Sequence, residues 1–258
     1  YYSAIKLCNA IPVGIPLKEE NDFRINPKDI EAKISDKTRL IIINSPQNPT
    51  GSVLTKEDCK EIYEIAKKHD VYLYSDEIYA RMLYDDTSFN SPSIYDTCSE
   101  RVIISNGFSK SFAMTGWRLG AVIGPVDVIE RMSMLLQTTS SCVSPFVQVA
   151  GMEAITGDQN KVHEMLNEYK QRRDILCDGL TSIQGISCMK PSGAFYVFVN
   201  IKKTGLSSEE FTNYLLDNAS VSLLPGTNFG EYGEGYVRLF YAINKEHIVE
   251  GLKRIKKS

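Results

Sequence analysis

The stretch SNGFSKSFAMTGWR, from Ser105 to Arg118, decides how this chain of 258 residues is interpreted. It places Lys110 in a short polar turn directly after the apolar run Val102–Ser105, and Arg118 follows eight residues later. A lysine amine in such a turn can form a Schiff base with an aldehyde, and an arginine guanidinium can bind a phosphate through its planar fork. The stretch therefore indicates a site for a small molecule that carries both groups.

The composition is that of an ordinary globular protein. Hydrophobic residues make up 43% of the chain and charged residues 24%, with a formal net charge of −3, so no strongly basic surface favours nucleic acid. Positive charge is concentrated only in Lys253–Lys257, where we expect the end of a helix. No apolar run approaches the roughly 20 residues that cross a bilayer. We therefore predict a protein that binds neither nucleic acid nor membrane.

The cysteines and histidines form no metal-binding pattern. The six cysteines include no CxxC pair, and the three histidines lie far apart in the sequence. We therefore predict no metal site, and reduced thiols in a cytoplasmic protein. The chain begins at Tyr1 with neither an initiator methionine nor the basic segment of a signal peptide, and we expect it to start within a longer polypeptide.

Strands alternate with helices in the first half of the chain. The amphipathic stretch Lys56–His69 predicts a helix, for which Thr55 offers an N-cap and Asp58 follows three residues later. Four apolar runs have strand character, and the last could run antiparallel to the others: Arg39–Asn44, Val71–Asp76, Val102–Ser105 and Gly120–Gly124. This alternation predicts βαβ units, and hence a mostly parallel sheet with helices on both faces.

The pattern changes near Pro145. Helical stretches and short apolar runs then follow one another to the end of the chain: Pro145–Ile155, Asn160–Ser182, Ala194–Val199, Ser208–Ala219, Val221–Leu224, Tyr236–Phe240 and Lys245–Lys256. We predict an α/β protein with a larger, mostly parallel part in residues 1–150. A smaller α+β C-terminal domain follows in residues 151–258, joined through the long helix.

Four motifs, taken together, resemble the class I and II aminotransferases, which are enzymes of fold type I that depend on pyridoxal 5′-phosphate (PLP). In chain order they are NPTG from Asn48, SDEIY from Ser75, the lysine stretch from Ser105, and VRLF from Val237. The NPTG sequence alone is a common turn, and it becomes specific at this distance before the second motif. The resemblance implies PLP as the cofactor, because PLP carries both an aldehyde and a phosphate.

The resemblance also implies which residues act on the cofactor ring. Lys110 would hold the aldehyde and later move a proton between the substrate Cα and the cofactor. Asp76 would keep the pyridine nitrogen protonated, so that the ring accepts electrons. Tyr79 and Asn48 would both meet the ring oxygen and lower the pKa of the imine. By the same resemblance Glu77 has no role in the chemistry.

The phosphate and the substrate have their own candidates. Arg118 and Ser109 match the phosphate-binding positions of the family, although Ser105 could replace Ser109. Arg238 matches the arginine that binds the substrate α-carboxylate as a bidentate pair, and Asn48 would also contact that carboxylate. Each assignment has a plainer alternative: a solvated loop for Lys110, a helix cap or loop acid for Asp76, and structural ion pairs for Arg118 and Arg238.

The sequence thus predicts an aminotransferase that moves an amino group between an L-amino acid and a 2-oxo acid in ping-pong order. Residues Phe112–Gly120 look more like the aspartate, aromatic or broad-specificity members than the carbon–sulfur lyases or cyclopropane-forming synthases, which share the scaffold. Two further alternatives remain: an aminotransferase-like sensor domain of a transcription regulator, and a fragment without activity. A homodimer is implied by the family alone.

The resemblance covers only about the last two-thirds of a family member. In relatives the preceding part supplies phosphate-binding amides at a helix start and an aromatic ring stacked on the pyridine, and the partner subunit supplies a tyrosine. We therefore expect part of the sheet to lie uncovered, and we expect this segment alone to bind PLP weakly or not at all.

Overall fold

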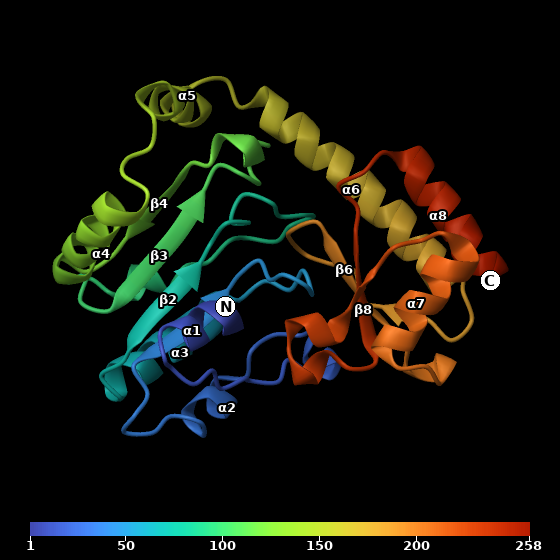
Figure 1. Ribbon diagram of the computed structural model, residues 1–258, viewed down its shortest axis with the longest axis horizontal. Helices are drawn as coiled ribbons and strands as arrows, with labels where there is room; N and C mark the ends of the chain where they lie inside the picture. Colours follow the sequence, from blue (N-terminus) through green and yellow to red (C-terminus); the bar gives the residue numbers. More distant parts are fainter.

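The computed structural model describes residues 1–258, which form two four-stranded sheets (Figure 1). The first sheet has the order β1-β2-β3-β4 and contains β1 (Leu40–Asn44), β2 (Tyr72–Asp76), β3 (Val102–Gly107) and β4 (Gly120–Ile123). Strands β1, β2 and β3 run parallel, and β4 pairs antiparallel with β3. The predicted mostly parallel sheet and its antiparallel last strand are confirmed.

Helix α3 (Lys56–Lys68) covers one face of this sheet. Its start is fixed by a reciprocal cap: Asp58 N donates to Thr55 Oγ1 at 3.1 Å, and Thr55 N donates to Asp58 Oδ2 at 2.8 Å. The helix buries Ile62 and Ala66 against alternate residues of the strands, among them Ile43 and Leu73. The residues on one side of α3 therefore pack against every second residue of the strands, and together they form one core.

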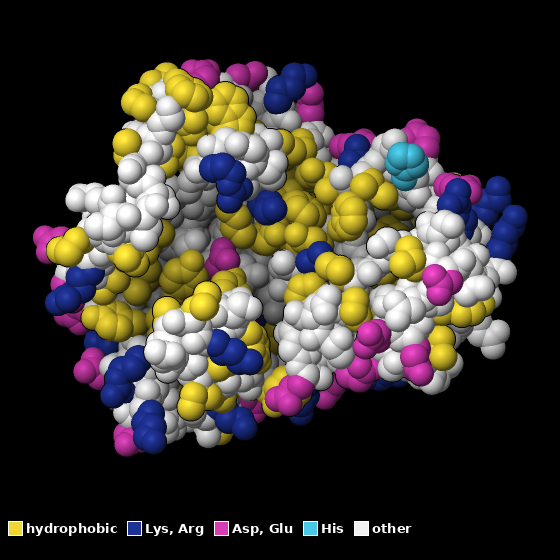
Figure 2. All heavy atoms as spheres, in the orientation of Figure 1, with side chains coloured by type: hydrophobic (Ala, Val, Ile, Leu, Met, Phe, Trp, Pro, Cys, Tyr) yellow, Lys and Arg dark blue, Asp and Glu magenta, His cyan; other side chains and the backbone are white.

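The rest of the first sheet is less covered. On its other face Leu40 is 43% exposed and Tyr72 is 37% exposed. All four residues of β4 are exposed, and helix α4 (Val126–Thr139) has no buried residue. Figure 2 shows apolar side chains gathered over α5 (Pro145–Thr156). The second helical layer that the sequence predicts is incomplete in this chain, and part of the sheet lies uncovered, as expected.

The second sheet is antiparallel and has the order β5-β6-β8-β7. Its strands are β5 (Ser187–Cys188), β6 (Tyr196–Asn200), β7 (Leu224–Pro225) and β8 (Tyr236–Phe240), and its helices are α6 (Asn160–Thr181), α7 (Ser208–Ala219) and α8 (Lys245–Lys257). A core of 15 buried residues lies between strands and helices. Figure 1 shows α6 extending from the end near α5 to the second sheet.

Several boundaries differ from the sequence prediction. The run Val221–Leu224 is not a four-residue strand, because only Leu224 and Pro225 pair with β8. Pro225 has no N–H to offer a further partner, and the chain turns at once into a 3-10 helix over Gly226–Phe229. Helix α4 is not predicted at all, since Pro125 begins it without a capping side chain.

The remaining elements are short. Helices α1 (Tyr2–Leu7) and α2 (Pro27–Glu31) lie in the N-terminal segment, which has no predicted element. All six cysteines are free thiols. None of the helices combines the length and the apolar character that crossing a membrane requires.

Candidate active site

The last residues of β1 and β2 are in register with each other and with Ser105 of β3. Asn44 pairs with Asp76, and Asp76 pairs with Ser105. The Asn44 side chain donates to the backbone oxygen of Asp76 at 2.9 Å, and Glu77 N donates to Ser105 O at 2.8 Å. Open α/β sheets bind ligands at the carboxyl ends of their strands. The predicted site residues at and after the ends of these strands therefore lie at one edge of the first sheet.

The loop after β1 carries Asn48 toward the second sheet. Asn48 N donates to the Asn44 side chain at 2.9 Å, which fixes the loop on the strand end. The Asn48 side-chain oxygen accepts from Arg238 Nη1 of β8, also at 2.9 Å. Two residues 190 positions apart, both predicted to contact the substrate carboxylate, are thus hydrogen-bonded to each other.

Arg238 is held by aromatic rings rather than by an acid. Its guanidinium carbon lies 4.5 Å from the ring centroid of Tyr196 and 4.9 Å from that of Phe229, a distance at which cation–π attraction operates. Its Nε is buried and has no hydrogen-bond partner. Burial lowers the pKa of Arg238 from its ordinary value. A buried donor without a partner is costly, and a bound carboxylate would satisfy it.

Tyr79 lies beside the same rings. It is only 3% exposed, and its hydroxyl is 2.9 Å from that of Tyr196. Its ring meets Phe195 edge to face, with centroids 5.5 Å apart. Burial, followed by the contact with Tyr196, raises the pKa of Tyr79 well above its ordinary value. Tyr79 is therefore a neutral hydroxyl that can donate a hydrogen bond.

Lys110 reaches this group of rings from the loop after β3. Its Nζ lies 5.7 Å from the centroid of Phe195, the ring that also packs against Tyr79. The side chain is half-buried and forms no ion pair with any acid. An amine without a carboxylate partner is available to react, which is what a Schiff-base lysine requires.

Asp76 has a partner that the sequence analysis missed. Its Oδ1 accepts from Ile78 N at 3.2 Å, and its Oδ2 accepts from the Tyr1 hydroxyl at 2.5 Å. Burial and the nearby carboxylate raise the pKa of Tyr1. Glu77 instead bonds Ser75 and Ser91, in the buried interior. Tyr1 lies 75 positions from Asp76 in the sequence, and no motif marks it.

The predicted phosphate ligands lie apart from the cluster of rings. Arg118 is exposed, and its Nη1 donates to Thr115 O at 2.9 Å. It adopts a left-handed backbone with φ 54°, as does Ala113 with φ 53°, a conformation that few non-glycine residues adopt. Ser109 is half-buried and its hydroxyl forms no hydrogen bond. No contact joins either side chain to the other predicted residues, and no acid pairs with Arg118.

The residues present fit PLP. An unpaired amine, a carboxylate, two hydrogen-bonding groups for the ring oxygen and an arginine with free donors correspond to the groups that this cofactor carries. The orphaned Nε of Arg238 adds a place for a carboxylate. Figure 2 shows the molecule hollowed between the two sheet units, with isolated acidic and basic side chains in the hollow.

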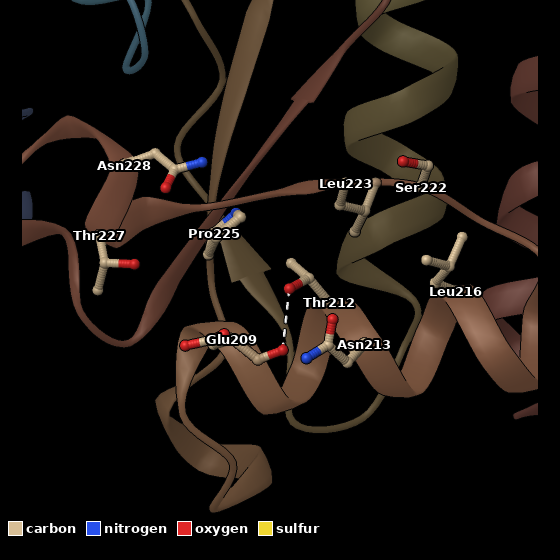
Figure 3. Close-up of a pocket in the computed structure, with 9 residues that line it drawn as sticks. All are labelled: Glu209, Thr212, Asn213, Leu216, Ser222, Leu223, Pro225, Thr227 and Asn228. Atoms are coloured by element: carbon tan, nitrogen blue, oxygen red, sulfur yellow. Dashed lines mark hydrogen bonds between the residues drawn. The ribbon is translucent and has the colours of Figure 1, made fainter.

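A separate groove of about 270 Å³ lies in the second unit, between α7 and residues 222–228 (Figure 3). Small polar side chains such as Thr212 and Asn228 line it, together with Glu209. None of the predicted site residues lies there, so the groove is separate from the site described above.

The comparisons with known proteins agree with this architecture. The class is that of the fold type I aminotransferases, since the whole chain superposes on an aromatic aminotransferase from Pyrococcus horikoshii with a TM-score of 0.97 at 42% identity, covering 69% of that protein. The chain matches the family model of aminotransferase class I and II over residues 1–255. It belongs to that family, whose members use PLP.

Proteins named as aminotransferases align with the full length of this chain. It is 46% identical to an aspartate aminotransferase of Pyrococcus horikoshii and 42% identical to aromatic-amino-acid aminotransferase 2 of Thermococcus litoralis. Each alignment covers 100% of this chain and 66% of the relative. A Thermus thermophilus aspartate aminotransferase structure superposes with a TM-score of 0.93 at 34% identity. The chain thus spans about two-thirds of the length of these proteins.

Proposed function

We propose that this chain carries most of the active site of a PLP-dependent aminotransferase, which moves an amino group between an L-amino acid and a 2-oxo acid. The observation that carries the proposal is Arg238: its Nε is a buried donor without a partner, and Asn48 holds the same guanidinium at 2.9 Å. The unpaired amine of Lys110 lies against the same cluster of rings. A substrate that offers a carboxylate and an amine matches both groups.

The ring end of the site binds and orients the cofactor. PLP, when bound, supplies a ring that withdraws electrons from the substrate Cα. The Asp76 carboxylate would pair with the protonated pyridine nitrogen, and the Tyr1 hydroxyl, 2.5 Å from its Oδ2, holds that carboxylate in place. Tyr79 would donate a hydrogen bond from its hydroxyl to the ring oxygen. Asn48 would donate a second one through Nδ2, because its Oδ1 is taken by Arg238.

Lys110 performs the proton transfer. Its Nζ would hold the aldehyde of PLP and, once freed by the substrate amine, would serve as the base that moves the proton of the substrate Cα. Arg238 orients the substrate through its carboxylate, which places Cα within reach of that amine. Arg118 and Ser109 would bind the phosphate of the cofactor.

We propose aspartate and aromatic amino acids as the first donors to test, because relatives at 46% and 42% identity carry those names. We also propose a homodimer in the cytoplasm. In support, α4 and α5 expose apolar side chains such as Leu135 at 63% and Phe146 at 70%, and large exposed apolar surfaces commonly mark interfaces. We further propose residues 1–150 and 151–258 as the two domains.

The proposal is tested by steady-state kinetics of the whole protein. Initial rates with donor and 2-oxo acid both varied should give the parallel reciprocal plots of a ping-pong reaction. Arg238→Lys removes the bidentate fork and should raise the KM of both substrates about tenfold or more. The control is Arg254→Lys, which changes an exposed arginine of α8. PLP binding without any amino transfer would contradict the proposal and favour the sensor alternative.

A further inference from the structure

Tyr196 touches both ends of the proposed site, although no motif marks it. It lies on β6, is 7% exposed, and places its hydroxyl 2.9 Å from that of Tyr79. Its ring centroid is 4.5 Å from the guanidinium carbon of Arg238. One buried side chain therefore contacts the hydroxyl assigned to the cofactor and the arginine assigned to the substrate.

The position of Tyr196 is set by the sheet rather than by a loop. Strand β6 pairs with β8 so that Phe198 lies directly opposite Arg238. Tyr196 is two residues from Phe198, hence on the same face and diagonal to Arg238, within the reach of an aromatic ring. Phe195 and Tyr79 pack against the Tyr196 ring, with centroids 4.7 and 5.8 Å away. The hydroxyl therefore has little freedom to move away from Tyr79.

The number of protons available decides which hydroxyl donates in the bond between Tyr79 and Tyr196. A tyrosine hydroxyl has one proton and can also accept. If Tyr79 gives its proton to the ring oxygen of the cofactor, it can bond Tyr196 only as an acceptor, and Tyr196 must be the donor. A donated bond makes Tyr79 a stronger donor in turn, because hydrogen bonds in a chain polarise one another.

We propose that Tyr196 is a positioning residue, which directs the Tyr79 proton toward the ring oxygen of the cofactor while its ring orients Arg238 for the substrate carboxylate. The inference rests on the proposed function. It assigns to Tyr196 two effects that a purely structural tyrosine would not have. One is on the pH at which the bound cofactor titrates, and the other is on the KM for carboxylate substrates.

The test compares Tyr196→Phe with Tyr84→Phe in the whole protein loaded with PLP. Tyr84 is a matched control: it is 2% exposed, and its hydroxyl donates to Ala194 O, two residues from Tyr196, without contacting Arg238. Both variants lose one buried hydroxyl and keep the ring. Thermal unfolding of each variant measures how much stability is lost with the hydroxyl.

In Tyr196→Phe the midpoint of the pH titration of the cofactor absorbance should rise by about 0.1 to 0.5 unit, because Tyr79 keeps its own bond to the ring oxygen and loses only the strengthening by Tyr196, about 10–30% of a bond to a charged group. Tyr84→Phe should leave the midpoint in place. In a Tyr79→Phe background the Tyr196→Phe change should add no further shift, because its target hydroxyl is absent. The KM should stay within about threefold of the parent, since the ring over Arg238 remains, whereas Tyr196→Leu should raise it further.

The outcomes separate the two claims. A parent protein that shows no cofactor absorbance at all overturns the proposed function and this inference with it. A parent protein that titrates normally, beside a Tyr196→Phe variant with the same midpoint, overturns the inference alone. An equal shift in Tyr84→Phe also overturns it, because any lost buried hydroxyl would then have the same effect.

Discussion

The two sides of the proposed site are built differently. On the carboxylate side, Asn48, Tyr79, Tyr196 and Arg238 are hydrogen-bonded or packed together between the two sheets. On the phosphate side, Arg118 is exposed and contacts only the backbone of Thr115. The neighbouring β4 and α4 have no buried residue. We refer to these as the closed side and the open side.

The difference teaches which part of the site this chain forms by itself. The closed side draws on the loops after β1 and β2 and on strands β6 and β8, and Tyr79 and Tyr196 belong to one cluster of buried residues. On the open side the Arg118 guanidinium forms one hydrogen bond, to Thr115 O, and its other N–H groups have no partner. A phosphate bound there would find the charge but only part of the usual set of backbone donors. This is the physical basis for expecting weak PLP binding by this chain alone.

The largest expected effect comes from truncating one leucine in the covered core of the second sheet and one on the open side. Leu180→Ala, in the core of the second sheet at 1% exposure, should cost about 2–5 kcal/mol of unfolding free energy. Leu135→Ala, in α4 at 63% exposure, should cost less than about 0.5 kcal/mol. Urea unfolding of this chain measures both. A cost at Leu135 near that at Leu180 would mean that the open side is covered in solution.

A second, smaller test uses helix caps. Thr55 bonds Asp58 N at the start of α3, whereas Ser144 precedes α5 without a side-chain cap bond. Thr55→Ala should therefore cost about 1 kcal/mol, and Ser144→Ala less than about 0.5 kcal/mol. Equal costs in urea unfolding would show that Ser144 forms a side-chain cap of α5 in solution.

The smallest expected effect concerns a tie between the two sheet units. Asp85, after β2, accepts from buried Arg173 of α6 at 2.9 Å and from Lys170 at 2.8 Å. These contacts lower the pKa of Asp85 to about 2. Because the pKa falls on folding, the stabilisation is present above the unfolded-state pKa, near 4, and is lost as the pH falls toward 2.

Since the Asp85 side chain is 51% exposed, Asp85→Asn should cost at most about 1 kcal/mol at pH 7. The difference from the parent should shrink to nothing between about pH 4 and pH 2 in denaturant titrations. Asp70→Asn, at 96% side-chain exposure, is the control and should change the unfolding free energy by less than about 0.5 kcal/mol. A pH-independent cost at Asp85 would rule out the charge as its cause.

Local signals predicted most of the fold. Thr55 and Asp58 form the cap that their spacing indicates, and α7 spans Ser208–Ala219 as predicted. Such features depend on residues three or four positions apart, which a sequence displays directly. In the apolar run Val221–Leu224 only Leu224 pairs with β8, because pairing, and not the apolar content of a run, decides where a strand exists.

The site was predicted from motifs, and its missing members are those that only tertiary structure assembles. Tyr196 bonds a residue 117 positions away, and Tyr1 bonds one 75 positions away. Tyr196 lies in the predicted apolar run Ala194–Val199, but nothing in that run marks it as a site residue, and Tyr1 belongs to no predicted run. The motif residues Asn48 and Arg238 could be named, but the sequence did not show that one holds the other, since that contact requires both sheets to be in place.

The most direct test of the central claim is the absorbance spectrum of the whole protein with PLP, recorded for the parent and for Lys110→Ala, with amino acids added one at a time. We predict a band near the visible edge in the parent that aspartate or an aromatic amino acid bleaches, and no such band in Lys110→Ala. A parent band that no amino acid bleaches, or one that persists in Lys110→Ala, would contradict an aminotransferase that works through this lysine.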